Sequence, residues 1–381
     1  MPRSRWTPIV AYSLVGAATQ LVWLNFAGIT TVAAARYDVS ENAIGWLAQV
    51  FPLLYVVLAI PAGLLLDRWF RPSLLIGALL TALGALLRLG DTYPWLLTGQ
   101  LVASVAQPLV LNAVTGITGR YLSPRDRPTG IAAGTASIFA GMVIAFVLSA
   151  FLASSNQIPV VLVISAIFSV IAAIALLLAL RLPALHTSAS PRPDRNALRT
   201  AWSDPLIRRL CLLAMFPFGV FVALTTFAQA LLEPSGVSAS TASTILLVNV
   251  IAGVLGSATI PILVSRHQAA SAQLTLSLTA TAIACVCLAL FPGPLVGYLA
   301  ITTIGVLLLP ALPVVLEIVE RQTGEAEGTA AGLIWMSGNL GGLLVATAVG
   351  LMVNHPTPAF LVMAAIALIA TPGARALRHS L

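Results

Sequence analysis

The sequence carries very little charge for its length. Among its 381 residues only 8% are charged and none is a lysine, whereas 59% are hydrophobic. The charges lie mainly in the short gaps between long apolar stretches. Because a water-soluble protein needs a charged surface, this composition argues against a soluble enzyme and favours a chain that lies in lipid.

Cysteine is also scarce. The three cysteines, Cys211, Cys285 and Cys287, are odd in number and fall inside apolar stretches. In such places a cysteine behaves as a small apolar packing residue. We therefore expect no disulfide framework, no metal site and no cofactor.

Long apolar stretches, by contrast, are abundant. Twelve of them are long enough to cross a bilayer as α-helices, and none shows the alternating pattern of a membrane β-barrel. The sequence thus predicts an all-α membrane protein with helices near 7–35, 43–66, 73–89, 94–119, 129–153, 158–182, 206–232, 240–264, 269–291, 295–318, 328–353 and 357–373.

The arginines sort by the side of the membrane on which the predicted loops lie. Only Arg36 and Arg88 fall on the side opposite the two termini. By the positive-inside rule both termini are expected in the cytoplasm, with the chain in the plasma membrane. The net charge of +7 is then explained by topology, and no nucleic-acid partner is expected.

One polar interruption is longer than the others. It divides the chain into a predicted bundle of six helices at 1–182, a cytoplasmic linker at 183–205, and a second bundle of six at 206–381. Two such bundles with a binding site between them near the midplane are the architecture of the major facilitator superfamily, which this arrangement resembles.

A short loop motif supports that resemblance. Gly63, Asp67, Arg68 and Arg71, between the second and third predicted helices, resemble the loop signature of the superfamily. The resemblance implies that Asp67 faces the positive end of the helix that begins near Gly328. The alternative is that the motif is only a solvated turn.

Ionisable groups inside the predicted helices are few. Glu317 is the one carboxylate that falls within a helix, close to its cytoplasmic end. It is either an interfacial, solvated group or a proton carrier. The absence of the acid and arginine positions typical of drug/proton antiporters disfavours that activity.

Neutral amides and aromatic rings occupy the helices instead. Gln20 and Trp23 share one helix face, and so do Trp335 and Asn339. Each of them alone is explained by helix packing. Together with Gln107 and Phe221 they form a candidate site for an organic cation, because π faces bind a quaternary ammonium without an ion pair.

Four segments carry a closer resemblance. They are similar to the transporters related to the feline leukaemia virus subgroup C receptor, which carry choline and ethanolamine and were earlier linked to haem. The segments are 43–68, 74–88, 99–127 and 312–333.

This resemblance implies a choline site at four positions. The aromatic and amide residues of the family fall on Trp23 and Gln107, which are identical here, and on Phe221 and Asn339, which replace a tyrosine and a glutamine. Phe221 keeps the ring but loses a hydroxyl.

We therefore expect a monomeric twelve-helix transporter, not an enzyme, that moves a choline- or ethanolamine-like cation by alternating access as a uniporter. One alternative is proton-coupled transport of a neutral or anionic metabolite or drug, in which Glu317 would act. A second, ranked last, is a receptor or scaffold that does not transport.

Overall fold

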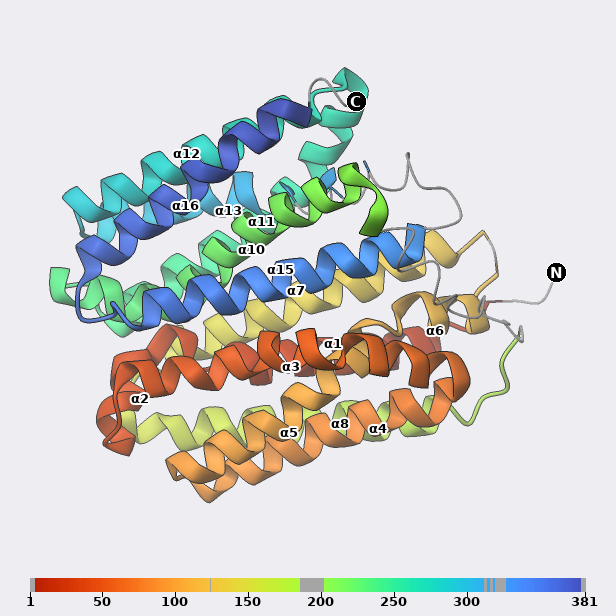
Figure 1. The fold of residues 1–381 in the computed structure, drawn as a ribbon. Coiled ribbons are helices and arrows are strands. Elements are labelled where there is room, and N and C mark those ends of the chain that lie inside the picture. Colours follow the sequence, from red (N-terminus) through yellow and green to blue (C-terminus); the bar gives the residue numbers. More distant parts are fainter. Residues whose placement is uncertain are drawn as a thin grey trace.

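The computed structural model describes residues 4–123, 125–185, 202–311, 314, 315, 318 and 327–377. In these residues all regular structure is helical. Eleven helices are long and apolar enough to cross a membrane, and Pro294–Leu308 is a shorter apolar helix that supplies a twelfth. The all-α fold predicted from the apolar stretches is thus confirmed (Figure 1).

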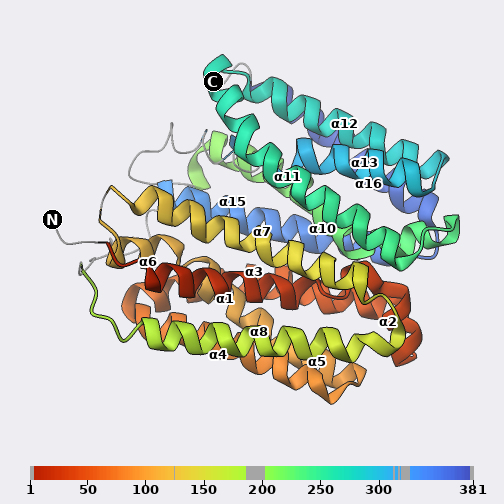
Figure 2. The ribbon, with the colours of Figure 1, turned by 180° about the vertical axis from the view of Figure 1, so that it is seen from behind.

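The helices form two groups that lie side by side (Figures 1 and 2). The first bundle contains α1 (Thr7–Leu24), α2 (Thr30–Tyr37), α3 (Glu41–Arg68), α4 (Phe70–Leu87), α5 (Tyr93–Leu111), α6 (Val114–Tyr121), α7 (Arg127–Phe151) and α8 (Ile158–Ala179). The second contains α10 (Pro205–Leu232), α11 (Ala239–His267), α12 (Ala270–Leu290), α13 (Pro294–Leu308), α15 (Glu327–Gly350) and α16 (Pro356–Ala376). Short 3-10 turns named η1 (Ala27–Ile29), η2 (Arg88–Gly90), η3 (Ser155–Gln157) and η4 (Glu233–Ser235) join or flank them.

Two pairs of helices make the largest contacts between the bundles, and η1 and α2 also touch α10 and α11. Helix α7 packs against α11, and α15 packs against α3. Both termini lie at the same end of the molecule, which we call the terminal end; the opposite end is the distal end (Figure 1). Much of the predicted linker, 183–205, lies outside the described residues.

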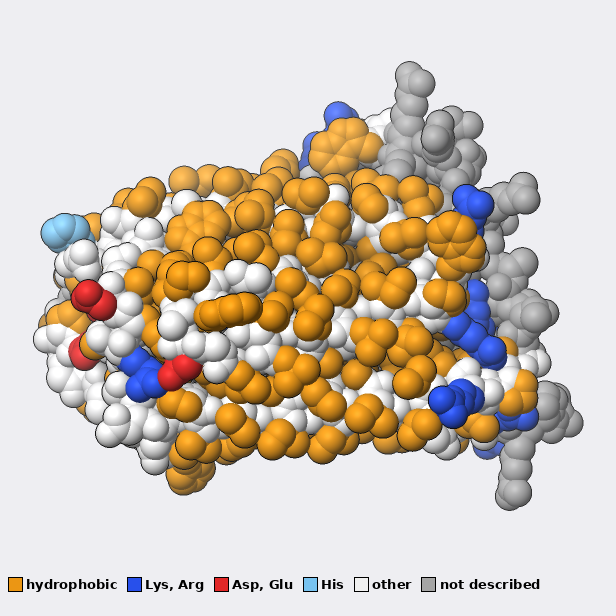
Figure 3. Space-filling model, turned by 90° about the horizontal axis from the view of Figure 1, so that it is seen from below, with side chains coloured by type: hydrophobic (Ala, Val, Ile, Leu, Met, Phe, Trp, Pro, Cys, Tyr) orange, Lys and Arg blue, Asp and Glu red, His pale blue; other side chains and the backbone are white. Residues whose placement is uncertain are grey.

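The surface fits a bilayer. On the face in Figure 3, hydrophobic side chains cover the middle of the molecule, basic side chains gather near the terminal end, and acidic side chains lie at the distal end. At the distal end Arg36 forms an ion pair with Asp91, whose other carboxylate oxygen accepts a 2.7 Å hydrogen bond from Tyr37 Oη.

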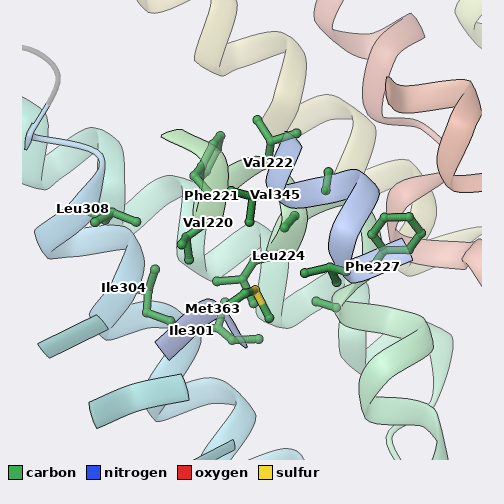
Figure 4. Packing of buried hydrophobic residues seen from close by; sticks show 14 of the residues in the cluster. Val220, Phe221, Val222, Leu224, Phe227, Ile301, Ile304, Leu308, Val345 and Met363 are labelled. Carbon is green, nitrogen blue, oxygen red and sulfur yellow. The ribbon is translucent and has the colours of Figure 1, made fainter. Parts of the chain in front are cut away.

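The interior is apolar and tightly packed. Figure 4 shows Leu224 of α10 close to Ile301 of α13 and Met363 of α16, in one buried cluster that also contains Val220 and Phe221. Cys211 and Cys285 are buried, Cys287 is half-buried, and all three are free thiols, as the sequence predicts.

In the described residues the predicted stretches 7–35, 94–119 and 295–318 are interrupted, the last of them at 309–310. The stretch 7–35 divides into α1, η1 and α2, and the stretch 94–119 divides into α5 and α6 after Asn112. Pro108 lies one turn before the second break, and its missing N–H leaves the Ser104 carbonyl without the usual helical hydrogen bond. No proline accompanies the first break, which therefore needs another cause.

Candidate functional site

Three of the predicted site residues lie near the middle of their helices. Trp23 is sixteen residues into the span Thr7–Tyr37, and Phe221 is sixteen residues into the span Pro205–Ser235. Asn339 is at the centre of α15. Gln107 lies four residues before the end of the span Tyr93–Leu111, which α6 follows. The superfamily architecture puts its binding sites near the midplane.

Trp23 is held against α3. Its indole Nε1 donates a 2.8 Å hydrogen bond to the carbonyl oxygen of Ala48, and its ring lies 6.2 Å from that of Phe51. Only 5% of the Trp23 surface is exposed. Phe51 is thus a neighbour of the candidate site that the sequence argument missed, although it falls in the same apolar stretch as Ala48.

A second aromatic group joins α10 and α15. The Phe218 ring lies 6.3 Å from Phe221 and 6.2 Å from Trp335, which it meets edge to face. Asn339 Nδ2 donates to the carbonyl oxygen of Trp335 at 2.9 Å, so this amide bonds within its own helix. Trp23 and Phe221 belong to one buried cluster, and no ring contact joins these two described side chains.

Buried amides lie on the helix that carries Trp23 and on the helices that pack against it. Gln20 is 1% exposed, and its Oε1 has no hydrogen-bond partner. Gln49, the residue after Ala48, accepts a 2.9 Å bond from Thr347 of the second bundle, while its Nε2 has no partner. Gln107 is likewise buried. Gln20 and Gln49 thus leave one buried acceptor and one buried donor without a partner. Gln49 was not among the candidate residues named from the sequence, although it is an amide within a predicted span, which is the criterion that selected Gln20 and Gln107.

The two bundles are tied together in the distal half. Thr31 and Gln229 exchange two hydrogen bonds of 2.7 Å. Ser243 Oγ donates to the Gly28 carbonyl at 2.9 Å, and Ser240 Oγ donates to the Ala150 carbonyl at 2.8 Å. These contacts link the region around α2 and the end of α7 to α10 and α11.

The structure describes only part of the loop motif at the terminal end. Arg71 Nη2 donates to the Leu182 carbonyl at 3.0 Å, and the Arg68 guanidinium lies 4.5 Å from the Trp69 ring. The space beside Gly63 is open. The side chain of Asp67 and all of Glu317 lie outside what the structure describes, as do the surroundings of Gly328. The predicted contact of Asp67 and the role of Glu317 as a proton carrier therefore stay predictions.

Nearby at the terminal end, Ser4 and Ser123 hold Asp126. Both hydroxyls donate to its carboxylate, Ser123 at 2.9 Å. These bonds lower the pKa of Asp126 below its ordinary value. They attach the start of the chain to the segment that precedes α7.

The burial of Arg88 does not follow from the sequence. This residue was expected on the distal side together with Arg36, and the structure does put it at the distal end of α4. Its side chain, however, is fully buried rather than solvated. It is the only charged side chain among the described residues that is buried to this degree.

Comparison with known proteins agrees with this geometry. The chain is 29% identical over 149 residues to the choline/ethanolamine transporter FLVCR2 of Homo sapiens, a match that covers 38% of this chain and 28% of that protein. It is 28% identical over 286 residues to solute carrier family 49 member A3 of Danio rerio, covering 69% and 60%. These matches thus span about a quarter to three fifths of the relatives' own lengths.

Solved structures share the fold. The nucleoside transporter NupG superposes with a TM-score of 0.73 at 16% identity, over 97% of this chain and 98% of that one. An inward-facing, unoccupied bacterial homologue of the human lysosomal transporter Spinster superposes with a TM-score of 0.78 at 14% identity, over 97% and 96%. The family model of the Major Facilitator Superfamily matches residues 9–346. The chain therefore belongs to this superfamily, and it is a multi-pass membrane transporter, not an enzyme.

Proposed function

We propose that the transporter moves a small organic cation of the choline or ethanolamine type. The observation that supports this proposal is the setting of Trp23. It is a buried ring at mid-span that packs against Phe51, and two partly unpartnered amides lie on the same two helices, Gln20 on α1 and Gln49 next to Ala48 on α3. Buried polar atoms without partners are costly, so a ligand that satisfies them gains affinity. The names of relatives such as the choline/ethanolamine transporter FLVCR2 support the same substrate class.

Aromatic rings can bind an organic cation that has been desolvated on entering the site. The face of an indole attracts an ammonium group, and the attraction reaches about 2 kcal/mol when the pair is desolvated. Phe221, Phe218 and Trp335 supply further rings on the second bundle. We propose that the Trp23 and Phe221 groups approach the same ligand from opposite bundles, with Gln107 and Asn339 as polar partners.

The transport cycle follows from the two bundles. We propose that 1–182 and 206–381 rock as rigid bodies joined by the linker 183–205, in a monomer. The arginines near the terminal end favour a position of this end on the cytoplasmic side, with the protein in the plasma membrane (Figure 3). The distal end would then face outward. Because hydrogen bonds join the two bundles at the distal end, the structure would represent the state that is closed to the outside.

Uniport is the simplest mode for such a substrate. A monovalent cation that moves inward gains about 2.3 kcal/mol per 100 mV, which corresponds to about fiftyfold accumulation. No second driving ion is required.

Binding and flux measurements on the purified protein test this proposal. Choline and ethanolamine should stabilise it against heat, since a ligand at 100 times its Kd adds about 2.7 kcal/mol, whereas uncharged sugars should not. In proteoliposomes a potential negative inside should drive uptake of labelled choline. Absence of both effects with a folded protein rejects the proposed substrate class.

One observation favours a second candidate. The fully buried charge of Arg88 is positive, and such a charge opposes a cation and attracts an anion. Proton-coupled transport of a neutral or anionic metabolite, with Glu317 as the proton carrier, would use that charge. Stabilisation by organic acids in place of amines, with uptake that depends on a pH gradient, would support this candidate.

A further inference from the structure

The break in the first span leaves carbonyl groups that need partners. Helix α1 ends at Leu24, and five residues separate it from α2. The carbonyls of the last turn of a helix have no partner within that helix. At membrane depth water does not replace them, so other parts of the protein must donate hydrogen bonds.

Side chains distant in sequence supply these donors. Arg88 Nη1 lies 3.1 Å from the Val22 carbonyl oxygen, and Gln100 Nε2 lies 3.2 Å from the same atom. Ser149 Oγ donates to the Asn25 carbonyl at 3.1 Å. The broken end of α1 is therefore completed by η2, α5 and α7.

Only Nη1 of the Arg88 guanidinium is hydrogen-bonded, and its acceptors are neutral oxygens rather than a carboxylate. Besides Val22, its Nη1 lies 3.2 Å from Asn25 Oδ1 and 3.1 Å from Gln100 Oε1. The end of α1 carries the negative pole of the helix dipole, which stabilises a cation there. The missing Cβ of Gly99 makes room for the Arg88 side chain, because a Cβ at that position would lie 2.5 Å from Arg88 Cγ.

These contacts converge on Trp23. The Val22 carbonyl belongs to the peptide group that joins Val22 to Trp23, so Arg88 holds the backbone of Trp23 directly. Gln100 also donates to the Leu47 carbonyl at 2.9 Å, one residue before the Ala48 carbonyl that accepts from the indole. Arg88 and Gln100 together thus constrain the backbone of Trp23, and Gln100 also constrains the segment of α3 against which the Trp23 ring packs.

We propose that Arg88, together with Gln100, is a positioning residue that caps the broken helix α1 and orients Trp23 for the substrate. Arg88 acts through Trp23 and does not itself touch the substrate. The functional half of this inference rests on the proposed site at Trp23. The positional half does not depend on the identity of the ligand.

Fluorine NMR of the full chain labelled with 5-fluorotryptophan tests the positional half. The Trp23 and Trp335 signals are assigned with Trp23→Phe and Trp335→Phe. Arg88→Met should displace or broaden the Trp23 signal and leave the Trp335 signal in place, while Arg88→Lys should restore part of the parent spectrum. Arg36→Met is the matched control, because Arg36 lies at the same end and bonds to Asp91 and Ser155 instead.

Choline binding by calorimetry tests the functional half. Arg88→Met should weaken binding by about tenfold, which corresponds to about 1.4 kcal/mol. If Arg88→Met does not fold, Gln100→Leu removes the second donor to Val22 and should move the Trp23 signal as well. A folded variant whose Trp23 signal keeps its parent position overturns the inference. If choline fails to bind even the parent protein, the proposed substrate is rejected, while the fluorine signal still decides the role of Arg88.

Discussion

Thr31 and Gln229 form a reciprocal pair across the two bundles. The Thr31 N–H donates to Gln229 Oε1, and Gln229 Nε2 donates back to Thr31 Oγ1, both at 2.7 Å. Thr31 belongs to α2, which follows the break in the first span, while Trp23 precedes that break. One side of the break is thus fixed to the first bundle by Arg88, and the other side is joined to the second bundle.

Gln229→Leu should therefore open the distal end. The substitution removes both bonds of the pair, each with a net contribution of about 0.5–1.5 kcal/mol. The equilibrium should shift by about 1–3 kcal/mol toward the distal-open state, or roughly fivefold to a hundredfold in the ratio of states. Spin labels on the exposed Asn156 and Asn354, in a background without native cysteines, report this as a longer distance between the bundles.

The control for this variant is Gln157→Leu. Gln157 lies near the distal end, but its amide oxygen accepts a bond from Ser154 within the same bundle. Its replacement should leave the distance distribution unchanged. If both variants widen the distribution equally, the Thr31 pair does not hold the gate.

Gln20→Met should discriminate between the two proposed amines. Gln20 Oε1 is a buried acceptor without a partner. Ethanolamine offers N–H donors on its charged group, whereas choline offers only its hydroxyl. A hydrogen bond to a charged group contributes about 1.5–3 kcal/mol, so ethanolamine should lose roughly tenfold or more in affinity and choline less.

Calorimetry with both amines measures that difference. Gln273→Met is the control, because Gln273 is a buried glutamine of α12 whose amide bonds to Ser277. It should alter neither affinity. An equal loss for both amines in Gln20→Met would mean that Gln20 supports the helix rather than the ligand.

The sequence predicts the spans well because each one is a long apolar run, and hydropathy is a local property. It does not predict the break after Trp23. The segment from Asn25 to Ile29 contains no proline. The Val22 carbonyl just before it is bonded by Arg88 and Gln100, and the Asn25 and Gly28 carbonyls within it accept from Ser149 and Ser243, all distant in sequence. A break stabilised by such partners has no local signal.

Arg88 illustrates the same limit at the level of one side chain. At the end of an apolar run, an arginine is expected to reach water. Its burial depends on the missing Cβ of Gly99 and on acceptors supplied by α1 and α5. By contrast, the positions of Trp23 and Gln107 within the predicted spans follow from counting along the apolar runs. This part of the candidate site could therefore be predicted from the sequence.

Transport is expected to be independent of pH and uncoupled from protons. The reason is the lack of an acid or histidine deep within the predicted spans, with Glu317 close to an end. Uptake of labelled choline into proteoliposomes loaded with a pH-sensitive dye measures flux and proton movement together. Acidification of the lumen that accompanies choline uptake and disappears in Glu317→Gln would establish proton coupling instead.

Trp23→Leu should weaken choline binding more than Gln107→Ala does. Removal of the indole eliminates a desolvated cation–π contact of about 2 kcal/mol or more, roughly thirtyfold in Kd. Removal of the Gln107 amide eliminates a neutral hydrogen bond with a net contribution of about 0.5–1.5 kcal/mol. Trp23→Phe keeps a π face but loses the bond to the Ala48 carbonyl, so it should retain part of the affinity. Calorimetry on the three variants, each confirmed as folded by its melting temperature, decides the order. A folded Trp23→Leu protein that binds choline as tightly as the parent would show that this ring does not hold the substrate.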